Sequence, residues 1–267
     1  MSDATPSLVQ TFMTHRMDDD AIRMLATGRE DETRRVMDAV ERSLQATPGA
    51  LQHLVLYGPR GIGKSFMTRL VQIECARLAA TRDLPIPFVL LSEEQHNLTR
   101  NPHALPAYIA HWLADWRTGE DHSWQGGMFQ WPDPDQEVRQ WDEATTRLET
   151  ELDLALPGSQ GMAIVVIENF DMLLASVFKD DTAEQRLRKW LDRDVPTDYA
   201  RPLDHAFHAL RREPWSQDCC IVYFNRRRES EGKPPLALEQ EAKARAIADF
   251  IGGSPRLAQL LAEVIET

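Results

Sequence analysis

A glycine-rich octapeptide at residues 58–65, Gly-Pro-Arg-Gly-Ile-Gly-Lys-Ser, constrains this chain more than any other feature. It matches the pattern G-x-x-x-x-G-K-[ST] in full. A β-prone run at 53–57 precedes it, and a helical pattern from Lys64 to about Ala80 follows. Glycines let the backbone turn so that its N–H groups point at phosphate oxygens, and the helix N-terminus adds the positive end of a dipole. The sequence therefore predicts a phosphate-binding loop (P-loop) between a strand and a helix.

Two side chains of this loop have expected roles toward a nucleoside triphosphate. Lys64 is expected to reach the β- and γ-phosphates, and Ser65 is expected to ligate Mg²⁺. The predicted ligands are thus ATP and Mg²⁺. The loop residues predicted to contact the nucleotide are Gly58, Pro59, Arg60, Gly61, Ile62, Gly63, Lys64, Ser65 and Phe66.

A second motif at 164–171 reads Ile-Val-Val-Ile-Glu-Asn-Phe-Asp. Four apolar residues run into a carboxylate, as in a Walker B strand, so Glu168 is the predicted metal-side acid. A nearby acid can then orient the attacking water. The alternative is an ordinary acid at the turn after a strand. The predicted catalytic residues are Lys64, Glu168, Asn169 and Asp171.

Strands that alternate with helices predict an α/β fold, a parallel P-loop sheet flanked by helices with a small C-terminal helical lid. The continuous apolar run at 163–167 is typical of a parallel strand buried on both faces. Two amphipathic helices at 239–250 and 255–265 form most of the expected lid. The predicted divisions are an N-terminal segment 1–27, a core 28–213 with an insertion at about 117–135, and a lid 214–267.

Composition indicates an ordinary soluble protein, with 42% hydrophobic and 27% charged residues. A net charge of −12 does not favour nucleic-acid binding by the surface as a whole, although the basic run 225–228 leaves DNA open as a partner. Three cysteines without disulfide or zinc spacing fit a reducing cytoplasm. No signal peptide is visible and no apolar run approaches the ~20 residues that span a bilayer, so no membrane partner is expected.

The P-loop, the acidic strand and the ending Gly-Gly-Ser-Pro-Arg at 252–256 together resemble the AAA+ superfamily, nearest the branch of origin-recognition and STAND-like ATPases. The resemblance covers about residues 28–267. Gly-Arg-Glu-Asp-Glu at 28–32 resembles the G-R-E-x-E element of that branch, which implies that Arg29 helps to seat the adenine. The resemblance also implies that Arg256 is the sensor 2 arginine, which points from the lid at the γ-phosphate.

The acidic strand departs from the family pattern, whose usual pair is Asp-Glu with the glutamate as base. This chain has Glu168-Asn169, and an asparagine can orient water but cannot take its proton. Either Glu168 or Asp171 acts as the base, or hydrolysis is slow and the protein is a switch. Glu93 and Glu94, after the second strand, are further acids expected near the site.

A sensor 1 strand, which the family places between the acidic strand and the segment resembled by 206–210, is also missing. Residues 192–201 are too polar for a central strand. Residues 219–225 are one alternative, with Asn225 as sensor 1, but Ser216 and Asp218 favour a capped helix there. Sensor 1 is then absent, or a segment near Arg193 is missing.

The leading hypothesis is an ATPase that couples nucleotide binding and hydrolysis to homo-oligomer assembly or to remodelling of a protein or DNA-bound partner, as in transposition-regulator or phage-defence ATPases. The sequence ends just after the lid, so the effector activity is expected in a protein partner or in a part of the protein outside this sequence. The alternative is a slow or non-hydrolysing nucleotide-dependent scaffold, and a P-loop kinase of small molecules is less favoured. Candidate arginine fingers, by position alone, are Arg201, Arg211 and Arg212.

Overall fold

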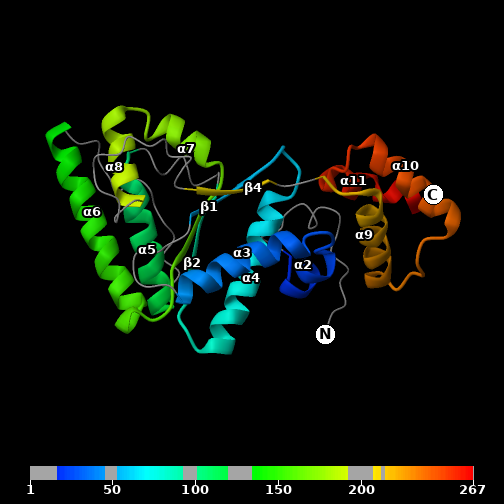
Figure 1. Cartoon of the computed structure of the whole chain (residues 1–267), viewed down its shortest axis with the longest axis horizontal. Coiled ribbons are helices and arrows are strands. Elements are labelled where there is room, and N and C mark those ends of the chain that lie inside the picture. Colours follow the sequence, from blue (N-terminus) through cyan, green and yellow to red (C-terminus); the bar gives the residue numbers. More distant parts are fainter. Residues whose placement is uncertain are drawn as a thin grey trace. The chain divides into compact units, whose positions relative to one another are not determined.

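The computed structural model describes residues 17–45, 53–92, 101–119, 134–191, 207–211 and 214–266 (Figure 1). The chain divides into two compact units. The first unit comprises the described residues within 1–42, 52–74 and 207–267, and the second comprises those within 43–51 and 75–206. Each unit is described by itself.

The first unit contains a parallel pair of strands, β1 (His53–Tyr57) and β4 (Phe207–Arg211). His53 lies opposite Phe207, and Tyr57 lies opposite Arg211. The P-loop follows β1 directly, and α4 (Lys64–Arg82) begins at its lysine. The predicted strand, loop and helix are therefore all present in this order.

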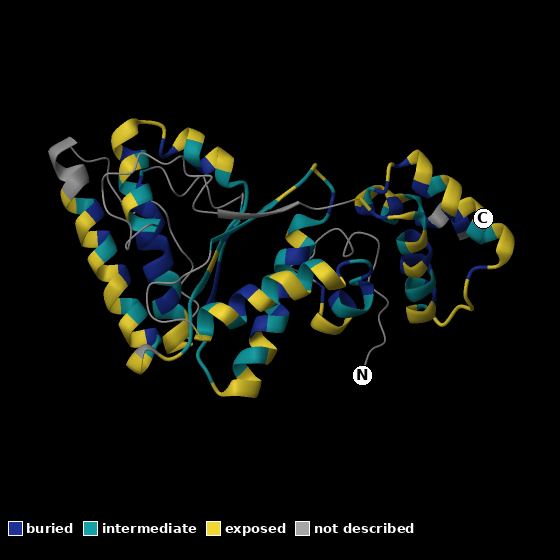
Figure 2. Ribbon diagram, viewed as in Figure 1, coloured by how far each residue is buried: buried dark blue, intermediate teal, exposed yellow. Residues whose placement is uncertain are grey.

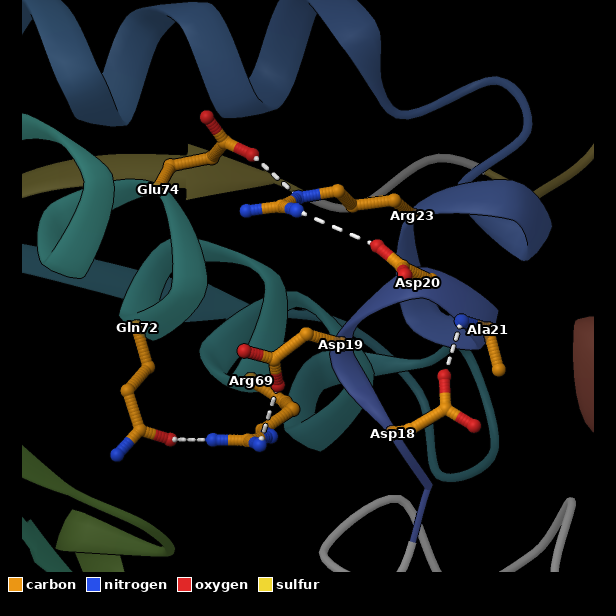
Figure 3. A network of polar contacts seen from close by, with 8 residues as sticks. All are labelled: Asp18, Asp19, Asp20, Ala21, Arg23, Arg69, Gln72 and Glu74. Carbon is orange, nitrogen blue, oxygen red and sulfur yellow. Dashed lines mark hydrogen bonds and ion pairs between the residues drawn. The ribbon is translucent and has the colours of Figure 1, made fainter. Parts of the chain in front are cut away.

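The N-terminal helices α2 (Asp19–Leu25) and α3 (Glu30–Gln45) also belong largely to the first unit. Two ion pairs join α2 to α4: Asp19 lies 2.7 Å from Arg69, and Arg23 lies 3.3 Å from Glu74 (Figure 3). Such partly exposed pairs each contribute at most about 1 kcal/mol. Ile22 of α2 is fully buried, so burial of its side chain contributes more to the position of α2 than either ion pair does.

The lid helices α9 (Gln217–Ser230), α10 (Leu238–Phe250) and α11 (Pro255–Glu266) pack on one another (Figure 1). Ser216 caps α9, because its hydroxyl accepts the main-chain N–H of Cys219 at 3.1 Å. The predicted capped helix is confirmed, and the alternative strand is excluded. Asn225, the sensor 1 candidate of that alternative, instead accepts the N–H of Leu236 at 2.8 Å, within the lid.

The second unit contains the other parallel pair, β2 (Phe88–Leu91) and β3 (Ile164–Ile167), in which Phe88 lies opposite Ile164. Leu105, Leu113, Trp141, Leu173 and Leu187 are among the side chains of its apolar core. Figure 2 shows the buried residues along α5. The helices of this unit are α5 (Ala104–Thr118), α6 (Pro134–Ala155), α7 (Phe170–Ser176) and α8 (Asp181–Leu191), with a 3₁₀ turn η3 (Pro157–Ser159).

The architecture is compatible with the predicted α/β class, but β3 is less buried than its sequence indicates. Val165 is 39% exposed, although the apolar run predicts burial on both faces. The described strands form two sheets of two strands each, and so narrow a sheet offers little face for helices to cover. Residues 192–206, where the sensor 1 strand was sought, lie outside the described residues.

The predicted insertion at about 117–135 stays a prediction. Helix α5 continues to Thr118, α6 begins at Pro134, and residues 120–133 lie outside the described part. The predicted boundary between core and lid at 213/214 stays a prediction, and the P-loop and the lid helices fall in one compact unit. Over the described ranges, no helix has the length and apolar character needed to cross a membrane.

Candidate nucleotide site

The P-loop has the backbone conformation that its glycines permit. Gly61 has a φ of 84°, a left-handed backbone conformation that is strained for residues with a Cβ. Ile62 is 2% exposed, so its side chain fixes the loop to the interior of the first unit. The first helical bond after the loop runs from the Met67 N–H to the Gly63 carbonyl at 3.0 Å. The N–H groups of the preceding first turn thus have no acceptor within the helix, which is the arrangement that binds anions.

Lys64 lies across the loop that precedes it. Its Nζ donates to the carbonyl oxygens of Gly58 at 2.9 Å and Pro59 at 3.3 Å. Among the described residues, no carboxylate pairs with Lys64, nor with the exposed cations Arg60 and Arg256. In a chain of net charge −12, cations without a described acid partner leave a locally positive loop.

The start of α11 lies close to the P-loop within the first unit. A Cβ at Gly61 would lie 3.4 Å from the Arg256 Cβ and 3.6 Å from the Ser254 Oγ. A methyl group at this position would thus be in van der Waals contact with both residues, so the Gly-Ser-Pro-Arg motif lies close to the P-loop. The sensor 2 role of Arg256 stays a prediction, and its proximity to the loop supports it.

Arg29 lies beneath the loop and is buried, with 3% exposure. Its guanidinium donates to the Ile62 carbonyl at 3.1 Å and to Glu32 at 3.3 Å, and its Cζ lies 5.7 Å from the ring centre of Trp215. Burial lowers the pKa of the guanidinium below its usual value, and the Glu32 carboxylate opposes that shift. Arginine stays charged in proteins, so this is a buried cation held by a main-chain carbonyl. Sequence patterns gave no signal for Trp215.

The predicted acidic residues belong to the second unit. The Glu168 N–H donates to the Leu91 carbonyl at 3.0 Å, which continues the β2–β3 pairing by one residue. Asn169 has φ 48° and ψ 49°, and its carbonyl accepts the Met172 N–H at 2.9 Å as α7 begins. Asp171 is exposed in the first turn of α7. Glu168, Asn169 and Asp171 are thus grouped at one strand end.

Several other predicted residues lie outside what the structure describes. These are Glu93 and Glu94 after β2, and the finger candidates Arg201 and Arg212. Arg211 is the last residue of β4, but the structure does not describe its side chain.

The parallel strand pairs and the helices around them are compatible with an α/β fold. Among solved structures, the fold is similar to that of the ORC1 protein of Aeropyrum pernix, determined in complex with DNA, with a TM-score of 0.57 and 18% identity. The match covers 90% of this chain and 60% of that protein, so this chain spans about three fifths of its length. Neither a protein-family model nor a curated protein matches the sequence. At this identity the similarity concerns the fold.

Proposed function

We propose that this protein binds ATP with Mg²⁺ at residues 58–66 and hydrolyses ATP slowly. The observation that carries the proposal is the locally positive loop: Lys64 donates to P-loop carbonyls and has no described acid partner, and Arg256 lies close enough to the loop that a Cβ at Gly61 would be 3.4 Å from its Cβ. A triphosphate supplies the negative charge that this arrangement lacks.

The chain's own residues have distinct tasks in this proposal. Lys64 exchanges its carbonyl contacts for β- and γ-phosphate oxygens, and the free N–H groups of the first turn of α4 bind the phosphates. Ser65 and Glu168 are the residues proposed to hold Mg²⁺, which would neutralise charge on the phosphate oxygens. Glu168 or Asp171 takes the proton of the attacking water, and Asn169 orients that water.

We further propose that ATP binding changes the lid and thereby oligomer assembly or the remodelling of a partner. Arg256 lies at the start of a lid helix, so an interaction of this arginine with the γ-phosphate would favour one lid position. A homo-oligomer and an effector protein are the proposed partners. The similar ORC1 protein was determined with DNA, so DNA is included among the partners to be tested.

The second candidate is a nucleotide-dependent scaffold that does not hydrolyse ATP. The conformation of Asn169 favours it, because this residue occupies the left-handed region that asparagine adopts more readily than glutamate. The family's usual base would be strained at this position.

Release of phosphate from ATP separates the two candidates. Wild type, Lys64→Ala and Lys243→Ala are compared, since Lys243 is an exposed lysine of α10 and matches the charge change. The ATPase predicts slow release that Lys64→Ala abolishes and Lys243→Ala preserves. ATP binding without release in wild type would support the scaffold, and neither binding nor release would refute both.

A further inference from the structure

We propose that Arg29 is a positioning residue that joins the P-loop to the lid, an inference that rests on the proposed nucleotide binding at this loop. The resemblance implies a contact of Arg29 with the adenine, whereas its guanidinium contacts a loop carbonyl, Glu32 and the ring of Trp215, two residues before the first lid helix. Arg29 therefore acts on the nucleotide through the loop and through Trp215.

The first step is the contact between Arg29 and the loop. The Ile62 carbonyl lies in the middle of the P-loop, two residues before Lys64, and accepts from Arg29 at 3.1 Å. Because the donor is charged and buried, this bond is stronger than one between neutral groups and fixes the orientation of the peptide. The peptide N–H groups that follow are those that would meet the phosphates, so Arg29 sets their direction.

The second step is the contact between Arg29 and the lid. The guanidinium faces the ring of Trp215, a favourable cation–π arrangement. The main-chain N–H of Trp215 donates to the Gly253 carbonyl at 2.8 Å, three residues before Arg256. A displacement of the Ile62 carbonyl would thus be transmitted to residues 253–256 through the Arg29 guanidinium, the Trp215 ring and the Trp215 main chain.

The third step is the fixation of the segment that carries Arg29. On its N-terminal side, the ion pair between Asp19 and Arg69, which does not involve Arg23, joins α2 to α4 (Figure 3). Arg226 of α9 donates to the Thr27 hydroxyl at 3.2 Å, and a Cβ at Gly28 would overlap the Cys219 Sγ. Residues 18–28 are thus bound both to the P-loop helix and to the first lid helix. Arg29 follows a fixed segment, so it can transmit a displacement rather than absorb it.

Hydrogen exchange without nucleotide tests the coupling in the full chain. Arg29→Met removes the charge at similar volume, and Arg23→Met is the matched control, because Arg23 pairs with Glu74 on the same segment without touching the loop. We expect Arg29→Met to accelerate exchange by about tenfold, the worth of one charge-assisted hydrogen bond, at both 58–66 and 215–222. Arg23→Met should leave both segments at wild-type rates.

Faster exchange at only one of the two segments, or the same pattern in Arg23→Met, would overturn the inference. If Arg29→Met does not fold, Trp215→Leu is measured in the same way and must accelerate exchange at 58–66. ATP titration is the second readout, with affinity about tenfold weaker in Arg29→Met than in Arg23→Met. Wild type that binds no ATP refutes the proposed function, whereas the exchange result decides the coupling in either case.

Discussion

Asn169 suits the backbone conformation at the end of β3, and it replaces the glutamate that the AAA+ pattern has as base at this position. It sits at φ 48° and ψ 49°, where β3 gives way to α7. Asparagine tolerates this region because its short polar side chain bonds locally, whereas longer side chains do so at a cost. The departure from an Asp-Glu pair therefore has a conformational reason within this chain.

Replacement of Asn169 tests that reason. Asn169→Glu should lower the free energy of unfolding by about 1 kcal/mol through left-handed strain, and Asn169→Gly should leave it equal or slightly higher. Urea unfolding of the three proteins measures both differences. An Asn169→Glu protein as stable as wild type would show that the backbone does not select asparagine here.

Gly252 and Gly253 offer a matched pair, because both have a left-handed φ, of 58° and 68°, but only Gly253 is crowded. A Cβ at Gly253 would overlap the Trp215 carbonyl oxygen and lie 2.8 Å from the Pro214 Cβ, whereas nothing lies within 4 Å at Gly252. We expect Gly252→Ala to cost about 1 kcal/mol and Gly253→Ala about 3 kcal/mol, the excess coming from overpacking. Thermal unfolding compares them, and equal losses would contradict the close approach of Gly253 to Trp215.

At the scale of elements, the end of α9 is stabilised by a carboxylate between two cations. Glu231 follows the last residue of α9 and lies 3.0 Å from Arg227 and 2.6 Å from Lys233. Burial alone would raise the pKa of Glu231, but hydrogen bonds from Lys233 and Arg227 outweigh it, so the pKa lies below the usual 4.5. A lowered carboxyl pKa stabilises the fold above 4.5, and this stabilisation is lost as the pH falls through the folded-state value.

Glu231→Gln should therefore lower the stability of the lid at neutral pH, by about 0.5–1 kcal/mol for a partly exposed pair. The difference from wild type should shrink as the pH falls below 4.5, where the wild-type carboxyl becomes protonated. Unfolding measured across pH gives the comparison. A difference that stays constant with pH would mean that Glu231 acts through packing rather than charge.

The elements could be predicted from sequence where local signals agreed. The 58–65 pattern set the end of β1 and the start of α4, and Ser216 with Asp218 set the start of α9. The contacts of Arg29 could not be predicted, because Ile62 and Trp215 lie 33 and 186 residues away and no pattern links them. The exposure of Val165 was likewise unpredictable, since an apolar run does not show how wide its sheet is.

At the scale of the whole molecule, the predicted site residues divide between the two compact units. The P-loop, Arg29 and Arg256 belong to the first unit, and Glu168 and Asn169 belong to the second. A net charge of −12 favours solubility and disfavours contact with nucleic acid over the general surface. Any association that depends on ATP would thus start from the locally positive loop and the lid.

Mass determination in solution tests that association. We expect a larger assembly with ATP and Mg²⁺ than without, because ATP is proposed to select one lid position. Lys64→Ala should stay at the nucleotide-free mass, and a second series with DNA shows whether DNA adds to the assembly. A wild-type mass that is the same with and without ATP would contradict assembly as the output of the site.

Calorimetric titration of ATP with Mg²⁺ into wild type, Lys64→Ala and Lys243→Ala tests the central claim most directly. The account predicts one site per chain with Kd in the micromolar range, about −8 kcal/mol, in wild type and in Lys243→Ala. Lys64→Ala should lose at least about tenfold in affinity, because it removes the one side-chain cation of the P-loop that is expected to contact the β- and γ-phosphates. Binding that is absent from wild type, or unchanged in Lys64→Ala, would contradict a nucleotide site at residues 58–65.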